Sequence, residues 1–120
     1  PEDDQVITLA RRVSAVQAQS PDSVKVVTDC NGDAMYFSRC PVPHSAEELL
    51  EHIGVYCFSP SSLQHCIRVG STVLSRTERL EQLAWLENGI RIRVIDGHFE
   101  GLGVDTPDDL ERAVEYFARK

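Results

Sequence analysis

The sequence predicts an α/β domain, in which helices flank a mixed β-sheet. An Asn-Gly pair between two apolar segments indicates an antiparallel hairpin early in the chain. A capped helical pattern then lies between two later strand patterns, the order typical of α/β proteins. The 120 residues are 42% hydrophobic, which fits a single domain with its own core over residues 1–120.

The expected strands are short and apolar. Residues 6–13 have no clear period, so a strand and a short helix both remain open there. Residues 24–28 form a strand, Asn31-Gly32 supplies the turn, and residues 34–38 form the return strand. Residues 52–58 form a further strand, followed by a short helix.

Helix signals separate these strands. Ser45 and Glu48 have the spacing of a capping box, which favours a short polar helix or a loop over residues 45–51. The pattern of residues 61–69 predicts a short helix. Residues 90–95 alternate as a strand, and their Ile and Val side chains share one face.

The strongest helix signal lies later in the chain. We expect one helix over residues 75–88, capped by Ser75, completed by Glu78 as a capping box, and stopped by Gly89. A last helix is expected over residues 107–119, with an apolar stripe toward the core.

Composition limits the function classes. The net charge of −7 argues against a nucleic-acid-binding surface. No apolar stretch is long enough for membrane insertion. The cysteines form no CxxC pair, so we expect most to be buried, reduced thiols in a cytoplasmic protein; they are Cys30, Cys40, Cys57 and Cys66.

The segment GVDTPDDL carries a candidate metal ligand. Thr106 is suited to cap a helix with Pro107 at its first position, and the helix dipole favours Asp108 and Asp109. Capping does not require Asp105, and a carboxylate there can ligate a hard cation such as Mg2+. The alternative interpretation is an ordinary helix start.

A second candidate is one face of the strand over residues 52–58. Period-2 geometry puts His52, Gly54 and Tyr56 on the same face. This combination is unusual for a core, and the glycine leaves room for a ligand. The alternative is a half-exposed edge face.

A third candidate is polar. The helix over residues 75–88 carries four residues on one face: Glu78, Glu81, Gln82 and Trp85. The adjacent carboxylate and amide can bind sugar hydroxyls, and the alternative interpretation, which the pattern alone favours, is a solvated helix face. Arg39, between a strand and a Pro-x-Pro turn, can clamp a carboxylate or phosphate, or can be a surface residue.

The chain also resembles a known family, the 3-deoxy-manno-octulosonate (KDO) cytidylyltransferases. The resemblance covers about residues 24–113 and is carried, in order, by VKVVTDCNGDAMYFSRCPVP, HIGVYCF, ERLEQLAWLENG and GVDTPDDLERA. It implies a nucleotide-diphospho-sugar transferase (Rossmann-like) fold and a cytoplasmic homodimer of lipopolysaccharide biosynthesis. It also implies that KDO attacks CTP, with Mg2+, to give CMP-KDO and pyrophosphate.

The resemblance assigns roles to individual residues. Asp105 matches the position of a catalytic Mg2+ ligand. The sugar site is implied for four residues, His52, Tyr56, Glu81 and Gln82, with Arg39 as a companion.

The departures from the family also matter. The chain resembles only the C-terminal, sugar-binding and dimerisation part, without the basic loop that grips the triphosphate. We therefore expect little turnover from the isolated chain. Ala84 stands where a basic residue is common, and the connection over residues 43–52 is shorter. Two alternatives remain, a cytidylyltransferase for a related acidic sugar and a non-catalytic sugar-binding or dimerisation module.

Overall fold

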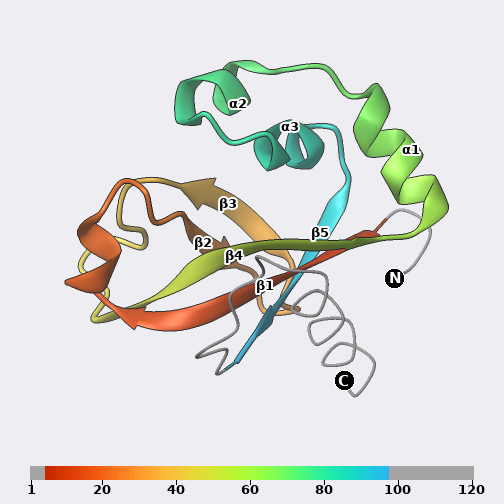
Figure 1. The fold of residues 1–120 in the computed structure, drawn as a ribbon. Coiled ribbons are helices and arrows are strands. Elements are labelled where there is room, and N and C mark those ends of the chain that lie inside the picture. Colours follow the sequence, from red (N-terminus) through yellow and green to blue (C-terminus); the bar gives the residue numbers. More distant parts are fainter. Residues whose placement is uncertain (1–4, 98–120) are drawn as a thin grey trace.

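The computed structural model describes residues 5–97, and over this range a mixed sheet carries its three α-helices on one side (Figure 1). The strands are β1 (Gln5–Ser14), β2 (Lys25–Thr28), β3 (Ala34–Ser38), β4 (Glu48–Phe58) and β5 (Arg91–Asp96). The helices are the 3-10 turn η1 (Gln17–Gln19), α1 (Pro60–Arg68), α2 (Val73–Glu78) and α3 (Gln82–Glu87). The predicted α/β class with a mixed sheet is confirmed.

The strand order is β3-β2-β4-β1-β5. β1 runs antiparallel to β4 and parallel to β5, so the open choice at residues 6–13 is decided in favour of a strand. Val6, Leu9 and Ala10 in β1 are completely buried. A strand covered on both faces needs no polar alternation, which explains why the sequence pattern did not decide.

β4 begins earlier than predicted. The expectation of a polar helix or loop over residues 45–51 holds as a loop for residues 45–47 and is wrong from Glu48 onward, because Glu48 already belongs to the strand. Leu49 pairs with Val13 of β1, and Leu50 pairs with Val26 of β2. Strand pairing on both sides satisfies the backbone and outweighs the local capping signal.

The predicted hairpin of β2 and β3 is confirmed. Oδ1 of Asp29 accepts hydrogen bonds from the backbone N–H of Asn31 at 2.8 Å and of Asp33 at 3.0 Å. Gly32 has a φ of +87°, which glycine adopts at no steric cost. The turn then reaches β5, where the N–H of Val94 donates to the carbonyl of Gly32 at 2.9 Å.

The predicted helix over residues 75–88 is in fact two helices. Thr72 caps α2 and Ser75 is the third residue of that capping box, so Ser75 is not the cap. Arg79 ends α2 in the left-handed conformation with a φ of 58°. The break turns Leu80 and Leu83 inward, and they are only 6% and 1% exposed.

Other expectations have mixed outcomes. The helix predicted over residues 61–69 is confirmed as α1, and Gly89, with a φ of +80°, ends the α3 region. The expectation that most cysteines are buried is wrong, since Cys30 and Cys40 are exposed in turns and only Cys66 is buried. No helix within residues 5–97 is long and apolar enough to cross a membrane.

Candidate functional site

A bulge in β4 shapes the candidate site. Thr8 of β1 pairs with Tyr56, whereas the next residue, Leu9, pairs with Ile53. Residues 54–55 therefore have no pairing partner in β1, and the strand bends there. Bulges of this kind redirect the side chains beside them.

The side chain of Thr8 fills the bulge. It is completely buried, and its hydroxyl donates to the carbonyl of Val55 at 2.8 Å. The same oxygen lies 2.8 Å from Nε2 of His52 and 3.3 Å from the carbonyl oxygen of Ile53. One side chain of β1 thus holds both ends of the bulge and one candidate site residue.

The predicted shared face of His52, Gly54 and Tyr56 is supported by the ring positions. The ring centroids of His52 and Tyr56 are 5.5 Å apart, and His52 packs against Phe37 at 4.9 Å. A Cβ placed on Gly54 meets no described atom within 4 Å, so space is open there. Burial lowers the pKa of His52 to about 4, so the ring is neutral at pH 7.

The row of rings continues to α3. The Tyr56 and Trp85 centroids are 5.2 Å apart in an edge-on arrangement, and Phe58 packs against Trp85 at 5.7 Å. Burial raises the pKa of Tyr56, and the Glu81 carboxylate raises it further. The structure therefore brings β4 and the start of α3, where Glu81 and Gln82 lie, into one region.

The polar groups along this row make no hydrogen bonds within residues 5–97. They are Nδ1 of His52, the Tyr56 hydroxyl, the Glu81 carboxylate and the Gln82 amide. Gln82 is only 6% exposed, which does not fit the alternative interpretation of a solvated helix face. The Gln82 amide is therefore available to a hydrogen bond from a ligand or from water.

Arg39 is arranged differently. Its guanidinium donates to three backbone carbonyls: Nε to Glu78 at 2.8 Å, Nη1 to Pro21 at 3.0 Å and Nη2 to Arg79 at 3.1 Å. These bonds hold the break between α2 and α3. The predicted clamp on a substrate anion stays a prediction, and in this structure the donors of Arg39 serve the fold.

Glu78 belongs to the same hydrogen-bonded frame. It does not lie on one helix face with Glu81 and Gln82, where the sequence predicts it. Its carboxylate accepts from the Tyr36 hydroxyl at 2.9 Å and from the backbone N–H of Arg39 at 3.2 Å. Burial by itself would raise the pKa of the Glu78 carboxyl. Hydrogen bonds from Arg39, Tyr36 and Ser38 favour the charged form more strongly, so the pKa lies below its usual value. The break at Arg79 separates Glu78 from Glu81.

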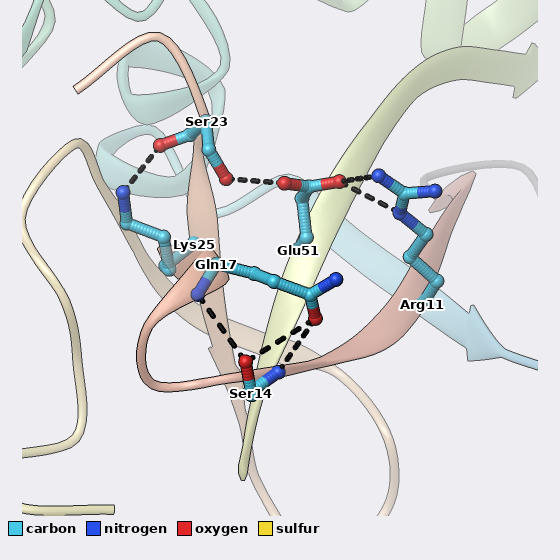
Figure 2. A network of polar contacts seen from close by, with 6 residues as sticks. All are labelled: Arg11, Ser14, Gln17, Ser23, Lys25 and Glu51. Carbon is cyan, nitrogen blue, oxygen red and sulfur yellow. Dashed lines mark hydrogen bonds and ion pairs between the residues drawn. The ribbon is translucent and has the colours of Figure 1, made fainter. Parts of the chain in front are cut away.

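A polar network fixes the strand register beside His52 (Figure 2). Glu51 accepts from Arg11, 2.6 Å away in β1, and from the hydroxyl of Ser23. Lys25 is completely buried in β2, pairs with Glu51 in the strand register, and donates to backbone carbonyls that include Ser23. Burial lowers the pKa of Lys25. The network ties together three strands where His52 begins the candidate face.

Two hollows border the candidate residues. One is lined by Gln17, Ser20, Asp22, Ser23, Val24, Glu51, His52 and Gly54. The other lies between the helices, where Glu81, Ala84 and Trp85 face Arg76 and Arg79. His52 and Glu81 thus border different hollows, and the row of rings connects them.

The predicted metal ligand is not placed by the structure. Asp105 and the whole GVDTPDDL segment lie outside the described residues. Within residues 5–97, no group of three or more His, Cys, Asp or Glu residues can hold a metal ion. His44 and His65 are exposed, and His98 lies outside the described range.

The sequence profile of the cytidylyltransferase family matches residues 1–92. The chain belongs to the cytidylyltransferase family. This match covers every described candidate residue from Arg39 to Gln82.

Curated members of this family give a more specific likeness. The chain is 45% identical to the 3-deoxy-manno-octulosonate cytidylyltransferase of Solibacter usitatus over 116 residues, which are 92% of this chain and 46% of the relative. It is 45% identical to the enzyme of the same name from Oleidesulfovibrio alaskensis over 112 residues, covering 89% and 45%. The chain thus spans about half the length of these cytidylyltransferases.

A solved structure supports the fold. The chain resembles a CMP:2-keto-3-deoxy-manno-octonic acid synthetase complexed with CTP, with a TM-score of 0.73 and 35% identity. The likeness covers 95% of this chain and 49% of the other. The predicted nucleotide-sugar transferase fold is therefore confirmed.

Sequence reasoning missed three residues of this cytidylyltransferase chain. Thr8 lies within residues 6–13, where the pattern leaves both a strand and a helix open. Its contact partner His52 is 44 residues away in the sequence. Glu78 was assigned to the wrong face, and Lys25 was read only as part of a strand. No local signal marks Thr8, whereas a lysine within an apolar strand can prompt a search for its partners.

Replacing Arg39 by lysine tests its role in the frame. We expect Arg39→Lys to lower the free energy of unfolding by about 1–2 kcal/mol, because a single ammonium cannot reach all three carbonyls. Urea unfolding measures this. The control is Arg76→Lys, since Arg76 is exposed and, among the described residues, its side chain donates to the Ser71 hydroxyl alone. Unchanged stability with weaker substrate binding would instead make Arg39 a substrate ligand.

Acid should destabilise the chain through His52. Its pKa is about 4 in the folded chain and 6.5 in the unfolded chain, so the unfolded chain binds the proton more readily between these values. The contribution of the neutral His52 ring to the free energy of unfolding is therefore fully present above pH 6.5, and it is lost as the pH falls toward 4. Between pH 7 and pH 4.5 we expect wild type to lose about 2 kcal/mol more than His52→Gln in urea unfolding. Equal losses would show that His52 is not held neutral.

Proposed function

We propose that this chain is the sugar-recognition part of a CTP-dependent KDO cytidylyltransferase. In that reaction the anomeric hydroxyl of KDO attacks the α-phosphate of CTP, forming CMP-KDO and releasing pyrophosphate. The observation that carries the proposal is the set of polar groups along the ring row that have no hydrogen bond within residues 5–97, above all the amide of Gln82, a residue that is 6% exposed. The names of the curated relatives support it.

The polar groups fit a polyhydroxylated ligand. The Gln82 amide offers a donor and an acceptor, and the Glu81 carboxylate offers acceptors only. A sugar presents hydroxyls that can donate and accept, so it can satisfy both groups. Neutral His52 and the un-ionised Tyr56 hydroxyl add further hydrogen bonds without adding charge.

The rings serve a second purpose. His52, Tyr56 and Trp85 present a continuous apolar and aromatic surface. Such surfaces cover the C–H groups of a ligand while polar groups fix its orientation. Ring packing against the core leaves these side chains little freedom, so less conformational entropy is lost on binding.

Charge near α3 bears on the choice of acidic sugar. The hollow that contains Ala84 and Glu81 is also lined by Arg76 and Arg79. These two side chains can take the place of a basic residue at position 84 in binding a sugar carboxylate. A cytidylyltransferase for a related acidic sugar is therefore the second candidate function.

Several parts of the proposal depend on residues beyond the described range or on other chains. We propose that Asp105 ligates Mg2+, which would offset phosphate charge, and we derive no step through the metal. Because the chain spans about half of its relatives, most of the CTP site is proposed to lie outside it. A cytoplasmic homodimer acting in lipopolysaccharide biosynthesis is part of the same proposal.

Sugar binding tests the role of Gln82 directly. We expect Gln82→Met, which keeps the side chain's size but removes the amide, to raise the Kd for KDO about tenfold, the equivalent of about 1.4 kcal/mol. Calorimetry measures binding, and fluorescence of the single tryptophan, Trp85, reports the fold.

The matched control is Glu87→Gln, an exposed position on α3, which should leave the Kd unchanged. Equal KDO affinity of Gln82→Met and wild type would remove the amide from the site. No KDO binding by the wild-type chain would contradict sugar recognition by this chain.

Turnover tests Asp105. In a chimera that joins the front half of the Solibacter usitatus relative to this chain, we expect pyrophosphate release from CTP, KDO and Mg2+. Asp105→Asn should lower this rate at least about a hundredfold without unfolding, because a metal-site carboxylate offsets phosphate charge. Asp108→Asn is the matched control and should keep most activity. Full turnover of Asp105→Asn at saturating Mg2+ would remove Asp105 from the mechanism.

A further inference from the structure

The Thr8 hydroxyl has only one proton to donate. Its oxygen lies 2.8 Å from the carbonyl oxygen of Val55 and 3.3 Å from that of Ile53, and both carbonyls can only accept. The proton is therefore directed at Val55, with Ile53 as a weaker second acceptor. The lone pairs of the Thr8 oxygen can then only accept a hydrogen bond. This oxygen lies 2.8 Å from Nε2 of His52.

This arrangement assigns the proton on the imidazole. Two acceptors cannot form a hydrogen bond, so Nε2 of His52 must carry the hydrogen that it donates to Thr8. In a neutral imidazole the other nitrogen, Nδ1, then has no proton and acts as an acceptor. Burial, which keeps the His52 pKa near 4, maintains the neutral ring at pH 7.

The described residues leave Nδ1 of His52 free to accept a hydrogen bond from a ligand. Within residues 5–97 no hydrogen bond reaches Nδ1 of His52. The adjacent Glu51 carboxylate already accepts from Arg11 through one oxygen and from Ser23 through the other. His52 also borders a hollow next to Gly54, where the chain leaves space.

We propose that Thr8 is a positioning residue that holds His52 as its Nε2–H tautomer and so presents Nδ1 as an acceptor for a hydroxyl of the sugar. The inference rests on the proposed function for the identity of the ligand. An acceptor nitrogen selects a hydroxyl donor and repels a carboxylate or phosphate oxygen. Thr8 thereby decides which end of an acidic sugar can lie against His52.

Threonine is well suited to this position. Its β-branched side chain is stiff in a strand, which fixes the direction of the hydroxyl. Serine keeps the hydroxyl and removes a methyl group, whereas valine keeps the shape and removes the hydroxyl. The two substitutions therefore separate hydrogen bonding from packing.

The tautomer can be measured in the 120-residue chain without any ligand. Imidazole 15N chemical shifts at pH 7.5 distinguish protonated from unprotonated nitrogens, and His52→Gln assigns the signals. We expect Nε2–H in wild type and in Thr8→Ser, and a mixture of tautomers in Thr8→Val. Nδ1–H in wild type, or an unchanged tautomer in Thr8→Val, would overturn the inference.

KDO binding by the same chains separates this inference from the proposed function. We expect Thr8→Val to weaken KDO binding about fivefold to tenfold, and Thr8→Ser to restore most of it. If the tautomers behave as expected but wild type does not bind KDO, the proposed function fails and the role of Thr8 stands. If wild type binds KDO and Thr8→Val binds it equally, the role of Thr8 fails and the proposed function stands. Should Thr8→Val not fold, the wild-type tautomer still decides.

Discussion

The pairing of β1 with β4, and the bulge within it, is the constraint on which the site depends. Thr8 pairs with Tyr56 and its neighbour Leu9 with Ile53, so the strand must bend between these points. The Thr8 hydroxyl donates to the carbonyl of Val55, a residue that has no pairing partner in β1. The side chain of Thr8 thus supplies a hydrogen bond at the place where strand pairing supplies none. Fold and site therefore share one interaction.

The polar side chains of this region fall into two groups. The side chains of Arg39 and Glu78 form hydrogen bonds with other groups of the chain. These bonds hold the break between α2 and α3. The groups on His52, Tyr56 and Gln82 described above have no such partner within residues 5–97. A rigid frame of satisfied groups that positions unsatisfied ones is the arrangement expected of a preorganised binding site. The division also explains why two polar residues so close in sequence, Glu78 and Gln82, have different roles.

Sequence periodicity predicted correctly which side chains of β4 share a face. Alternation in a strand placed His52 and Tyr56 on one face, and their rings are indeed 5.5 Å apart. Helical periodicity failed for Glu78, because Arg79 takes the left-handed conformation and rotates the following turn away from the preceding one. The capping box at Ser45 failed for a related reason, since Glu48 and Leu49 pair with β1 instead of continuing a helix. Both errors come from contacts distant in sequence that outweigh a local preference.

The sequence by itself determined the class of fold, the hairpin at Asn31-Gly32, the strand face of His52 and Tyr56, and, through its motifs, the family. These follow from spacings of a few residues, which backbone geometry translates directly into neighbours in space. Only the tertiary structure decided which polar groups are satisfied and which remain available. Arg39 meets the carbonyl of Glu78, and Thr8 meets His52, across separations of 39 and 44 residues. No periodicity extends over such distances, so the hydrogen-bond partners that fix a tautomer or hold a helix break exist only once the sheet has formed.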